Sequence, residues 1–283
     1  MNASASKLHV ERRQAMGDAV TAGAAAASLA IRPSDPLVML HGWGMNLRVF
    51  DLLRDDLSDR ETWAIDLPGH GHSAWWPGAA HFEAQRDAVL AALPPRCVLV
   101  GWSLGAKLAL SIAAGFPRRV SALVLIAATP KHMQSPDWPQ GMKGESLRAF
   151  QRALTQNWQQ TLDDFVWLQL RGSRNAKEAQ RTIAAALAAQ GAPQPEALAS
   201  GLALLASVDL RAEVGRITQP TLIITGQNDR VTSPEAARWL AAAIPHARLV
   251  ELPRAGHAPL ISHHSEVATT IRDFLTSTPG LVA

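Results

Sequence analysis

A single serine lies between two glycines at the point where an apolar run gives way to a helical pattern. The stretch "LVGWSLGAKLAL" covers residues 99–110 and places Ser103 between Gly101 and Gly105. The spacing Gly-x-Ser-x-Gly after a strand and before a helix is typical of a tight turn that exposes a nucleophile. Backbone N–H groups at the start of the next helix can then stabilise an oxyanion. We therefore predict that Ser103 is a nucleophile; a merely structural turn is the alternative.

A serine nucleophile needs a general base, and the base needs a carboxylate that orients it. Asp229 ends the strand-like run "TLIITGQND", and His257 follows the strand-like "RLVELP". Both positions come directly after strands, so the side chains can meet Ser103 at one edge of a sheet. We predict His257 as the base and Asp229 as its partner. A turn-capping aspartate and an ordinary loop histidine are the alternatives.

An oxyanion hole needs a second N–H from the loop after an early strand. The segment "HGWG", residues 41–44, is that loop. We predict that the backbone N–H groups of Trp43 and Leu104 form the hole, and that His41 supports the loop by hydrogen bonds. The Trp43 ring either walls an acyl pocket or is a plain packing residue. No His or Cys spacing typical of a metal site occurs, so we expect neither a metal nor another cofactor.

The elements that would position these residues alternate along the chain. Short apolar runs that begin at residues 37, 62, 97, 121, 220 and 247 predict strands. Helical patterns lie between most of them, at about 47–58, 81–92, 104–116, 234–243 and 265–275. Apolar runs without alternation indicate strands buried on both faces. The sequence therefore predicts an α/β fold with a mostly parallel, doubly wound sheet.

The alternation stops between residues 131 and 210, a stretch rich in Gln, Ala, Trp, Leu and Arg. We predict a helical cap insertion there, over the sheet edge where open α/β folds bind ligands. The core would then comprise residues 37–130 and 211–283. Residues 1–36 are predicted to be a flexible N-terminal extension, whose basic and alanine-rich part only faintly resembles a secretion signal.

Composition limits the classes of partner. The 283 residues are 47% hydrophobic with a formal net charge of +3, which gives no reason to expect nucleic-acid binding. No apolar stretch reaches the roughly 18 residues of a membrane span. The single cysteine, Cys97, is expected to be a buried structural thiol, compatible with a reducing compartment. We expect a cytoplasmic monomer.

Taken together, these residues make the chain resemble the α/β-hydrolase superfamily over about residues 37–283. The motifs "LHGWGMN", "DLPGHGHS", "GWSLG", "DWP", "VDLR" and "HAPLISH" resemble more closely the carboxylesterases of biotin synthesis that cleave pimeloyl-(acyl-carrier protein) methyl ester. The resemblance implies release of methanol without a cofactor. It also implies an acyl-carrier protein bearing a methyl pimeloyl group as partner, with small esters as further substrates.

The resemblance also implies roles for individual residues. Ser103, His257 and Asp229 match the catalytic residues of that family, and Trp43 and Leu104 match substrate contacts near the oxyanion. The stretch "FQRAL" matches a substrate-contacting segment of the family: Phe150, Gln151, Arg152, Ala153 and Leu154. Four basic residues match its carrier-binding arginines loosely, a solvated helix face being the alternative: Arg148, Arg152, Arg171 and Arg174.

Other functions remain open on the sequence alone. A broad short-chain carboxylesterase, a C–C bond hydrolase or a lactonase would use the same three residues, because the shape of the acyl pocket decides among them. A non-catalytic ligand-binding protein on the same scaffold belongs to a different class, and the complete set of catalytic residues argues against it.

Overall fold

The computed structural model describes residues 8–16 and 31–278. At the centre of this part of the chain lies a sheet with the strand order β1-β3-β2-β4-β5-β6-β7. Strand β1 pairs with β3 in antiparallel fashion, and every other pair is parallel. The prediction of a mostly parallel α/β sheet is confirmed. The strands are β1 (Val10–Arg13), β2 (Leu37–Leu40), β3 (Thr62–Ile65), β4 (Cys97–Trp102), β5 (Val120–Ile126), β6 (Thr221–Gly226) and β7 (Ala247–Leu252).

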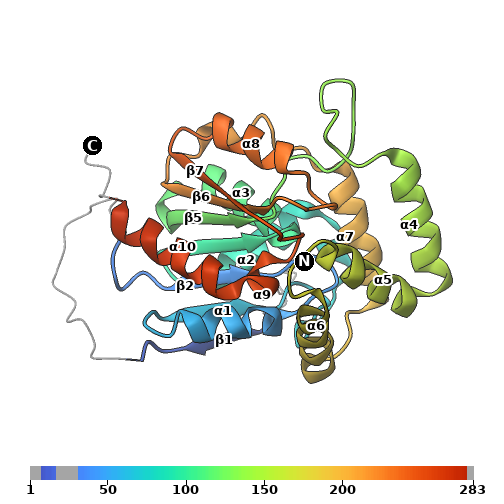
Figure 1. Ribbon diagram of the computed structural model, residues 1–283, viewed down its shortest axis with the longest axis horizontal. Coiled ribbons are helices and arrows are strands. Elements are labelled where there is room, and N and C mark those ends of the chain that lie inside the picture. Colours follow the sequence, from blue (N-terminus) through green and yellow to red (C-terminus); the bar gives the residue numbers. More distant parts are fainter. Residues whose placement is uncertain (1–7, 17–30, 279–283) are drawn as a thin grey trace, which may run out of the picture.

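Helices cover both faces of the sheet. Helices α1, α9 and α10 lie on one face, and α2 and α3 lie on the other (Figure 1). These core elements and the short 3-10 turns between them are α1 (Asp51–Asp56), α2 (Phe82–Ala92), α3 (Leu104–Gly115), α8 (Pro234–Ala243), α9 (Pro259–Ser262), α10 (His264–Ser277), η1 (Leu47–Phe50), η2 (Pro77–Ala80), η3 (Pro117–Arg119) and η4 (Val214–Arg216).

Four further helices lie between β5 and β6, within the stretch where the sequence predicts a helical cap. They sit beyond the carboxyl ends of the parallel strands, at the right of Figure 1. We call these helices the cap: α4 (Gly144–Gln156), α5 (Trp158–Leu170), α6 (Ala176–Gln190) and α7 (Pro195–Ser207).

A buried lysine ties both ends of the cap to helix α3. The Lys107 Nζ donates to the carbonyl oxygen of Pro130, where the chain leaves the core, at 3.0 Å. It also donates to the carbonyl oxygen of Val208, where the chain returns, at 3.0 Å. Burial lowers the pKa of Lys107 to about 7. The two carbonyl groups accept hydrogen bonds from the Lys107 ammonium, whose N–H groups would otherwise be buried without partners.

The prediction that residues 1–36 form a flexible extension is wrong for Val10–Arg13, which form strand β1. Glu11 in this strand accepts a hydrogen bond from the buried Arg54 at 2.9 Å. The run "VERR" carries charged residues because β1 is an edge strand, so the sequence shows no apolar signal for it. Residues 17–30, the alanine-rich part of that prediction, lie outside the described residues.

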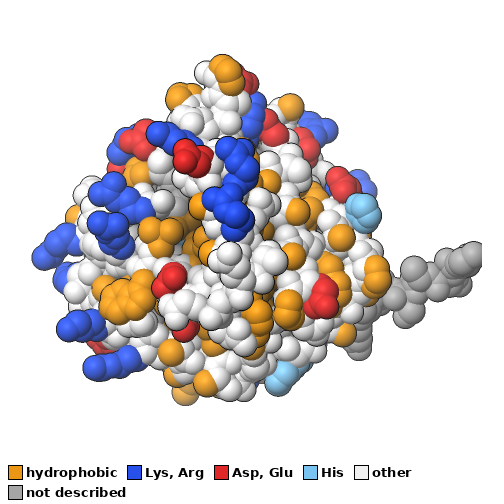
Figure 2. Space-filling view, turned by 90° about the vertical axis from the view of Figure 1, so that its right-hand side faces the viewer, with side chains coloured by type: hydrophobic (Ala, Val, Ile, Leu, Met, Phe, Trp, Pro, Cys, Tyr) orange, Lys and Arg blue, Asp and Glu red, His pale blue; other side chains and the backbone are white. Residues whose placement is uncertain are grey.

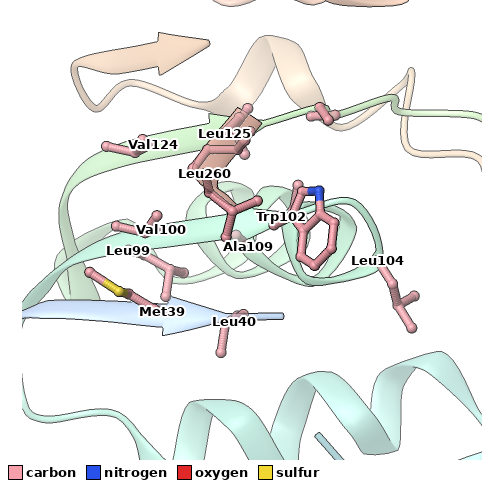
Figure 3. Close-up of a cluster of buried hydrophobic side chains, with 14 of the residues drawn as sticks. Met39, Leu40, Leu99, Val100, Trp102, Leu104, Ala109, Val124, Leu125 and Leu260 are labelled. Atoms are coloured by element: carbon pink, nitrogen blue, oxygen red, sulfur yellow. The ribbon is translucent and has the colours of Figure 1, made fainter. Parts of the chain in front are cut away.

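The core is built from strands whose side chains are buried on both faces. All residues of β2, β4, β5 and β6 are buried, and side chains from neighbouring strands pack together in Figure 3. Cys97 is buried, as predicted, and burial raises the pKa of its thiol to about 12. Within the described ranges, no helix has the length and apolar character needed to cross a bilayer.

Candidate active site

The turn at Ser103 joins β4 to α3 with a backbone conformation that residues other than glycine rarely adopt. Ser103 has φ 55° and ψ −113°, and its flanking glycines make close contacts. A Cβ at Gly101 would lie 2.5 Å from the Cα of Ala106, and a Cβ at Gly105 would lie 2.2 Å from the carbonyl oxygen of Leu40. Only glycine fits at either position, which explains the spacing seen in the sequence.

The structure brings Ser103, His257 and Asp229 together. The Oγ of Ser103 lies 2.9 Å from His257 Nε2, and His257 Nδ1 lies 2.8 Å from Asp229 Oδ2. The three residues follow β4, β7 and β6, whose carboxyl ends share one edge of the sheet. All three are buried. This arrangement can remove the Ser103 proton and hold the resulting imidazolium beside a carboxylate.

The Asp229 carboxylate is held by its own turn. Its Oδ1 accepts from the N–H groups of Val231 and Thr232, at 2.8 and 2.9 Å. Its Oδ2 accepts from the Thr232 hydroxyl at 2.8 Å. Sequence analysis missed Thr232, although an aspartate followed by a hydroxyl residue three positions later is typical of such a turn.

Two long-range contacts hold the backbone of His257. The Trp102 indole donates to the carbonyl oxygen of His257 at 2.9 Å. The His257 N–H donates to the carbonyl oxygen of Gln169, in cap helix α5, at 2.7 Å. The cap therefore takes part in positioning the histidine. Sequence analysis missed both contacts, because residues so distant along the chain carry no shared pattern.

The loop at residues 41–44 lies directly against the serine. A Cβ at Gly42 would lie 3.2 Å from the Ser103 Cβ. His41 Nδ1 bonds the Gly42 carbonyl oxygen at 2.8 Å, and its Nε2 accepts from the Leu67 N–H at 2.9 Å, which confirms the predicted support of the loop. Burial lowers the pKa of His41 to about 4, so the ring is neutral near pH 7.

Two N–H groups near the serine are free to donate. In the part of the chain that the structure describes, the Trp43 N–H has no protein acceptor. Leu104 is the first residue of α3, so its N–H has no carbonyl group one turn earlier in the helix. Both groups are thus available to an oxyanion.

An apolar pocket opens beside Ser103 under the cap. The Trp43 ring forms one wall, packing on Phe150 at 5.4 Å and on Phe165 at 5.1 Å between ring centroids. Its Nε1 donates to the carbonyl oxygen of Leu198 in α7 at 2.8 Å. Such a lining suits an aliphatic acyl chain. The other lining residues are His132, Met142, Leu168, Leu202, Leu205 and Val231.

The predicted substrate-contacting stretch does not enter this pocket as a whole. Phe150 lines it, and Leu154 is half-buried against the core. Gln151, Arg152 and Ala153 are exposed. All five lie on α4, and a helix of 3.6 residues per turn cannot direct five consecutive side chains to one side. Contact of Gln151, Arg152 and Ala153 with the substrate therefore stays a prediction, and any such contact would lie outside this pocket.

The four predicted carrier-binding arginines are all exposed on or next to the cap. Arg148 and Arg152 line an open groove on α4. Within the described ranges, Arg148, Arg152 and Arg171 have no acidic partner, whereas Arg174 pairs with Glu266 at 2.7 Å. Figure 2 shows the side of the molecule that carries α4, with Lys and Arg side chains among hydrophobic ones.

Comparison with known proteins places this geometry among the hydrolases. Residues 35–264 match a family described as alpha/beta hydrolase fold. A pimeloyl-(acyl-carrier protein) methyl ester esterase from Nitrosomonas europaea is 39% identical over 227 residues, covering 80% of this chain and 90% of that protein. A protein of the same name from Stenotrophomonas maltophilia is 39% identical over 242 residues, covering 85% of this chain and 93% of that protein.

Solved structures share the fold. A bromoperoxidase from Bacillus anthracis superposes with a TM-score of 0.80 at 18% identity, covering 95% of both chains. An esterase from Exiguobacterium antarcticum also gives a TM-score of 0.80, at 21% identity and with 95% of both chains covered. At these identities the likeness concerns the fold alone.

Proposed function

Since the chain belongs to the pimeloyl-(acyl-carrier protein) methyl ester esterase family of α/β-hydrolases, we propose that it hydrolyses that methyl ester in biotin synthesis, with Ser103 as nucleophile. The observation that carries the proposal is the pair of hydrogen bonds that join Ser103 to His257 and His257 to Asp229. The products are methanol and the pimeloyl-carrier protein.

The first half of the reaction forms an acyl-enzyme. His257 Nε2 takes the Ser103 proton as Oγ attacks the ester carbonyl carbon. The N–H groups of Trp43 and Leu104 stabilise the oxyanion that forms. His257 then gives the proton to the methoxy oxygen, and methanol leaves. Asp229 remains ionised and holds the imidazole in the tautomer that accepts at Nε2.

The second half of the reaction restores the enzyme. Water attacks the acyl carbon while His257 Nε2 takes its proton. The bond to Ser103 Oγ then breaks, and the serine regains the proton. The apolar pocket accommodates the methylene groups of the pimeloyl chain, while the carrier protein stays outside.

The exposed arginines of the cap favour binding of an acidic partner protein. Arg148, Arg152 and Arg171 offer charges that no acidic side chain of the described residues neutralises. An acidic carrier helix docked there would gain attraction mainly during encounter. We assign the carrier contact to this face of a cytoplasmic, monomeric enzyme, with small esters as poorer substrates.

Replacement of the nucleophile tests the proposal. We expect Ser103→Ala to abolish methanol release from methyl pimeloyl-carrier protein and to fail in rescuing a biotin-requiring host that lacks its esterase. Ser111→Ala is the matched control, because Ser111 is another buried serine, two turns into α3 and away from His257 in the hydrogen bonds of the site. Methanol release by the Ser103→Ala enzyme at the unmodified rate would refute the assignment.

Charge reversal tests the carrier contact. We expect Arg148→Glu with Arg152→Glu to raise KM for the carrier-bound ester about tenfold, which corresponds to about 1.4 kcal/mol. Hydrolysis of p-nitrophenyl esters should not change. Arg118→Glu is the control, because Arg118 is an exposed residue just before the amino end of β5. An equal change with both substrates would contradict the proposed contact.

The rival functions are separated by substrate. A broad carboxylesterase would cleave short p-nitrophenyl esters with higher kcat/KM than the carrier-bound ester, and a lactonase or C–C bond hydrolase would prefer its own substrate class. A fluorophosphonate probe that fails to label Ser103 would instead favour a ligand-binding protein.

A further inference from the structure

His132 is a buried polar residue that the proposed reaction does not use. It lies in the loop after β5 and lines the pocket that contains Ser103. The residue is only 6% exposed. Its Nδ1 is enclosed without a hydrogen-bond partner, and within residues 8–16 and 31–278 its Nε2 has no partner either. Leaving a buried polar atom without a protein partner costs about 1–3 kcal/mol, so the position of this ring is not explained by stability alone.

Apart from Ser103, the side chains that line the pocket offer no other free polar group. Apart from Ser103 and His132, its lining consists of apolar side chains and of Trp43. The Trp43 indole N–H is already occupied by the Leu198 carbonyl oxygen. Besides Ser103, the His132 ring is therefore the side chain of the pocket lining that can hydrogen-bond a polar atom entering the pocket.

The ring is electrically neutral in the working enzyme. Burial lowers the pKa of His132 to about 3; the positive charge of Lys107 acts in the same direction, and the Asp229 carboxylate opposes it. A neutral imidazole has one N–H and one free lone pair. It can therefore bond a water molecule without introducing a charge beside the acyl group.

Hydrolysis of the acyl-enzyme needs a water molecule beside His257 Nε2. His132 lines the same pocket as Ser103 and lies close enough to His257 for the two rings to interact electrostatically. A buried water normally has two to four polar partners, and His257 Nε2 supplies one of them. We propose that His132 is the second partner and positions the hydrolytic water against the acyl carbon. The water proton passes to His257 as the new C–O bond forms; His257 then returns this proton to Ser103 Oγ as the acyl–Oγ bond breaks. His132 transfers no proton. This inference rests on the proposed acyl-enzyme mechanism.

Two replacements of His132 by side chains of similar length distinguish an effect of hydrogen bonding on deacylation from an effect of packing. His132→Gln keeps a polar end that reaches about as far as Nε2, and His132→Met does not. With p-nitrophenyl butyrate in a stopped-flow instrument, the first release of p-nitrophenol reports acylation and the steady state reports deacylation. We expect His132→Met to acylate at the unmodified rate and to deacylate about tenfold more slowly, which produces a burst. His132→Gln should deacylate at nearly the unmodified rate.

Thermal stability distinguishes this role from a structural one. Because His132→Met removes a buried atom that lacks a partner, its Tm should equal or exceed that of the unmodified enzyme. His132→Phe is a second apolar replacement if the methionine packs poorly. A lower Tm with equal slowing of both steps would overturn the inference, as would a glutamine variant as slow as the methionine variant.

The same measurements keep the two proposals apart. Intact-mass analysis of the unmodified enzyme after reaction with a fluorophosphonate shows whether Ser103 is a reactive nucleophile. Absence of the label would overturn the proposed function and this inference together. An acyl-enzyme that all His132 variants hydrolyse at the unmodified rate would overturn the inference alone.

Discussion

At the scale of single residues, the Asp229 carboxylate is the most firmly held group of the site. Two backbone N–H groups and the Thr232 hydroxyl fix it, in addition to His257. These contacts hold the carboxylate in place beside the imidazolium that forms during the reaction. The turn therefore fixes the orientation of the histidine as well as the position of the aspartate.

Replacement of this carboxylate should affect the chemical step far more than the fold. We expect Asp229→Asn to lower kcat about 10⁴-fold, because an amide stabilises the wrong imidazole tautomer. Thr232→Val leaves the two backbone donors in place and should lower kcat only about tenfold. Steady-state hydrolysis of p-nitrophenyl butyrate measures both effects. Equal losses in the two variants would contradict this ranking.

At the scale of elements, the close approach of α3 to β2 places the serine. Gly105 allows it, because any Cβ there would meet the Leu40 carbonyl oxygen. With a side chain at this position, α3 could keep its present place only if β2 moved away. The turn at Ser103 therefore depends on the packing of α3 against β2 as well as on the strained backbone of Ser103.

A methyl group at this contact should separate the two elements. We expect Gly105→Ala to lower the free energy of unfolding by about 1–3 kcal/mol through overpacking and to reduce turnover, since Ser103 moves with the helix. Gly115→Ala is the matched control, because nothing lies within 4 Å of a Cβ at that end of α3. Urea unfolding measures both variants, and equal stabilities would contradict the expected clash.

At the scale of the whole molecule, the buried rings of His41, His70 and His132 have strongly lowered pKa values that link folding to pH. Burial lowers the pKa of His41 to about 4, and the pKa values of His70 and His132 to about 3. The unfolded chain binds protons on these rings near pH 6.5, whereas the folded chain does not. The unfolded state therefore binds more protons between about pH 6.5 and 4, and stability falls as the pH falls through this window.

Urea unfolding at pH 7, 6 and 5 measures this dependence. Each histidine contributes up to about 1.4 kcal/mol per pH unit within the window. Removing one of the three rings by His132→Met should make the curve shallower by about a third. A stability that does not change between pH 7 and 5 would contradict the assignment of these rings as buried and neutral.

The sequence was sufficient for the parts of the molecule that follow simple patterns. Apolar runs separated by helical patterns predicted the parallel strands, and the shared edge of their carboxyl ends predicted that Ser103, Asp229 and His257 could meet. Strand β1 was missed because three of its four residues are charged. The contact between Gln169 and His257 and the burial of His132 beside the pocket depend on how distant segments pack, which no local pattern records.

The two hydrogen bonds of Lys107, to the carbonyl oxygens of Pro130 and Val208, bear on how esters reach Ser103. Because both ends of the cap are hydrogen-bonded to one side chain of α3, an opening that keeps these two bonds would move the middle of the cap and leave its ends in place.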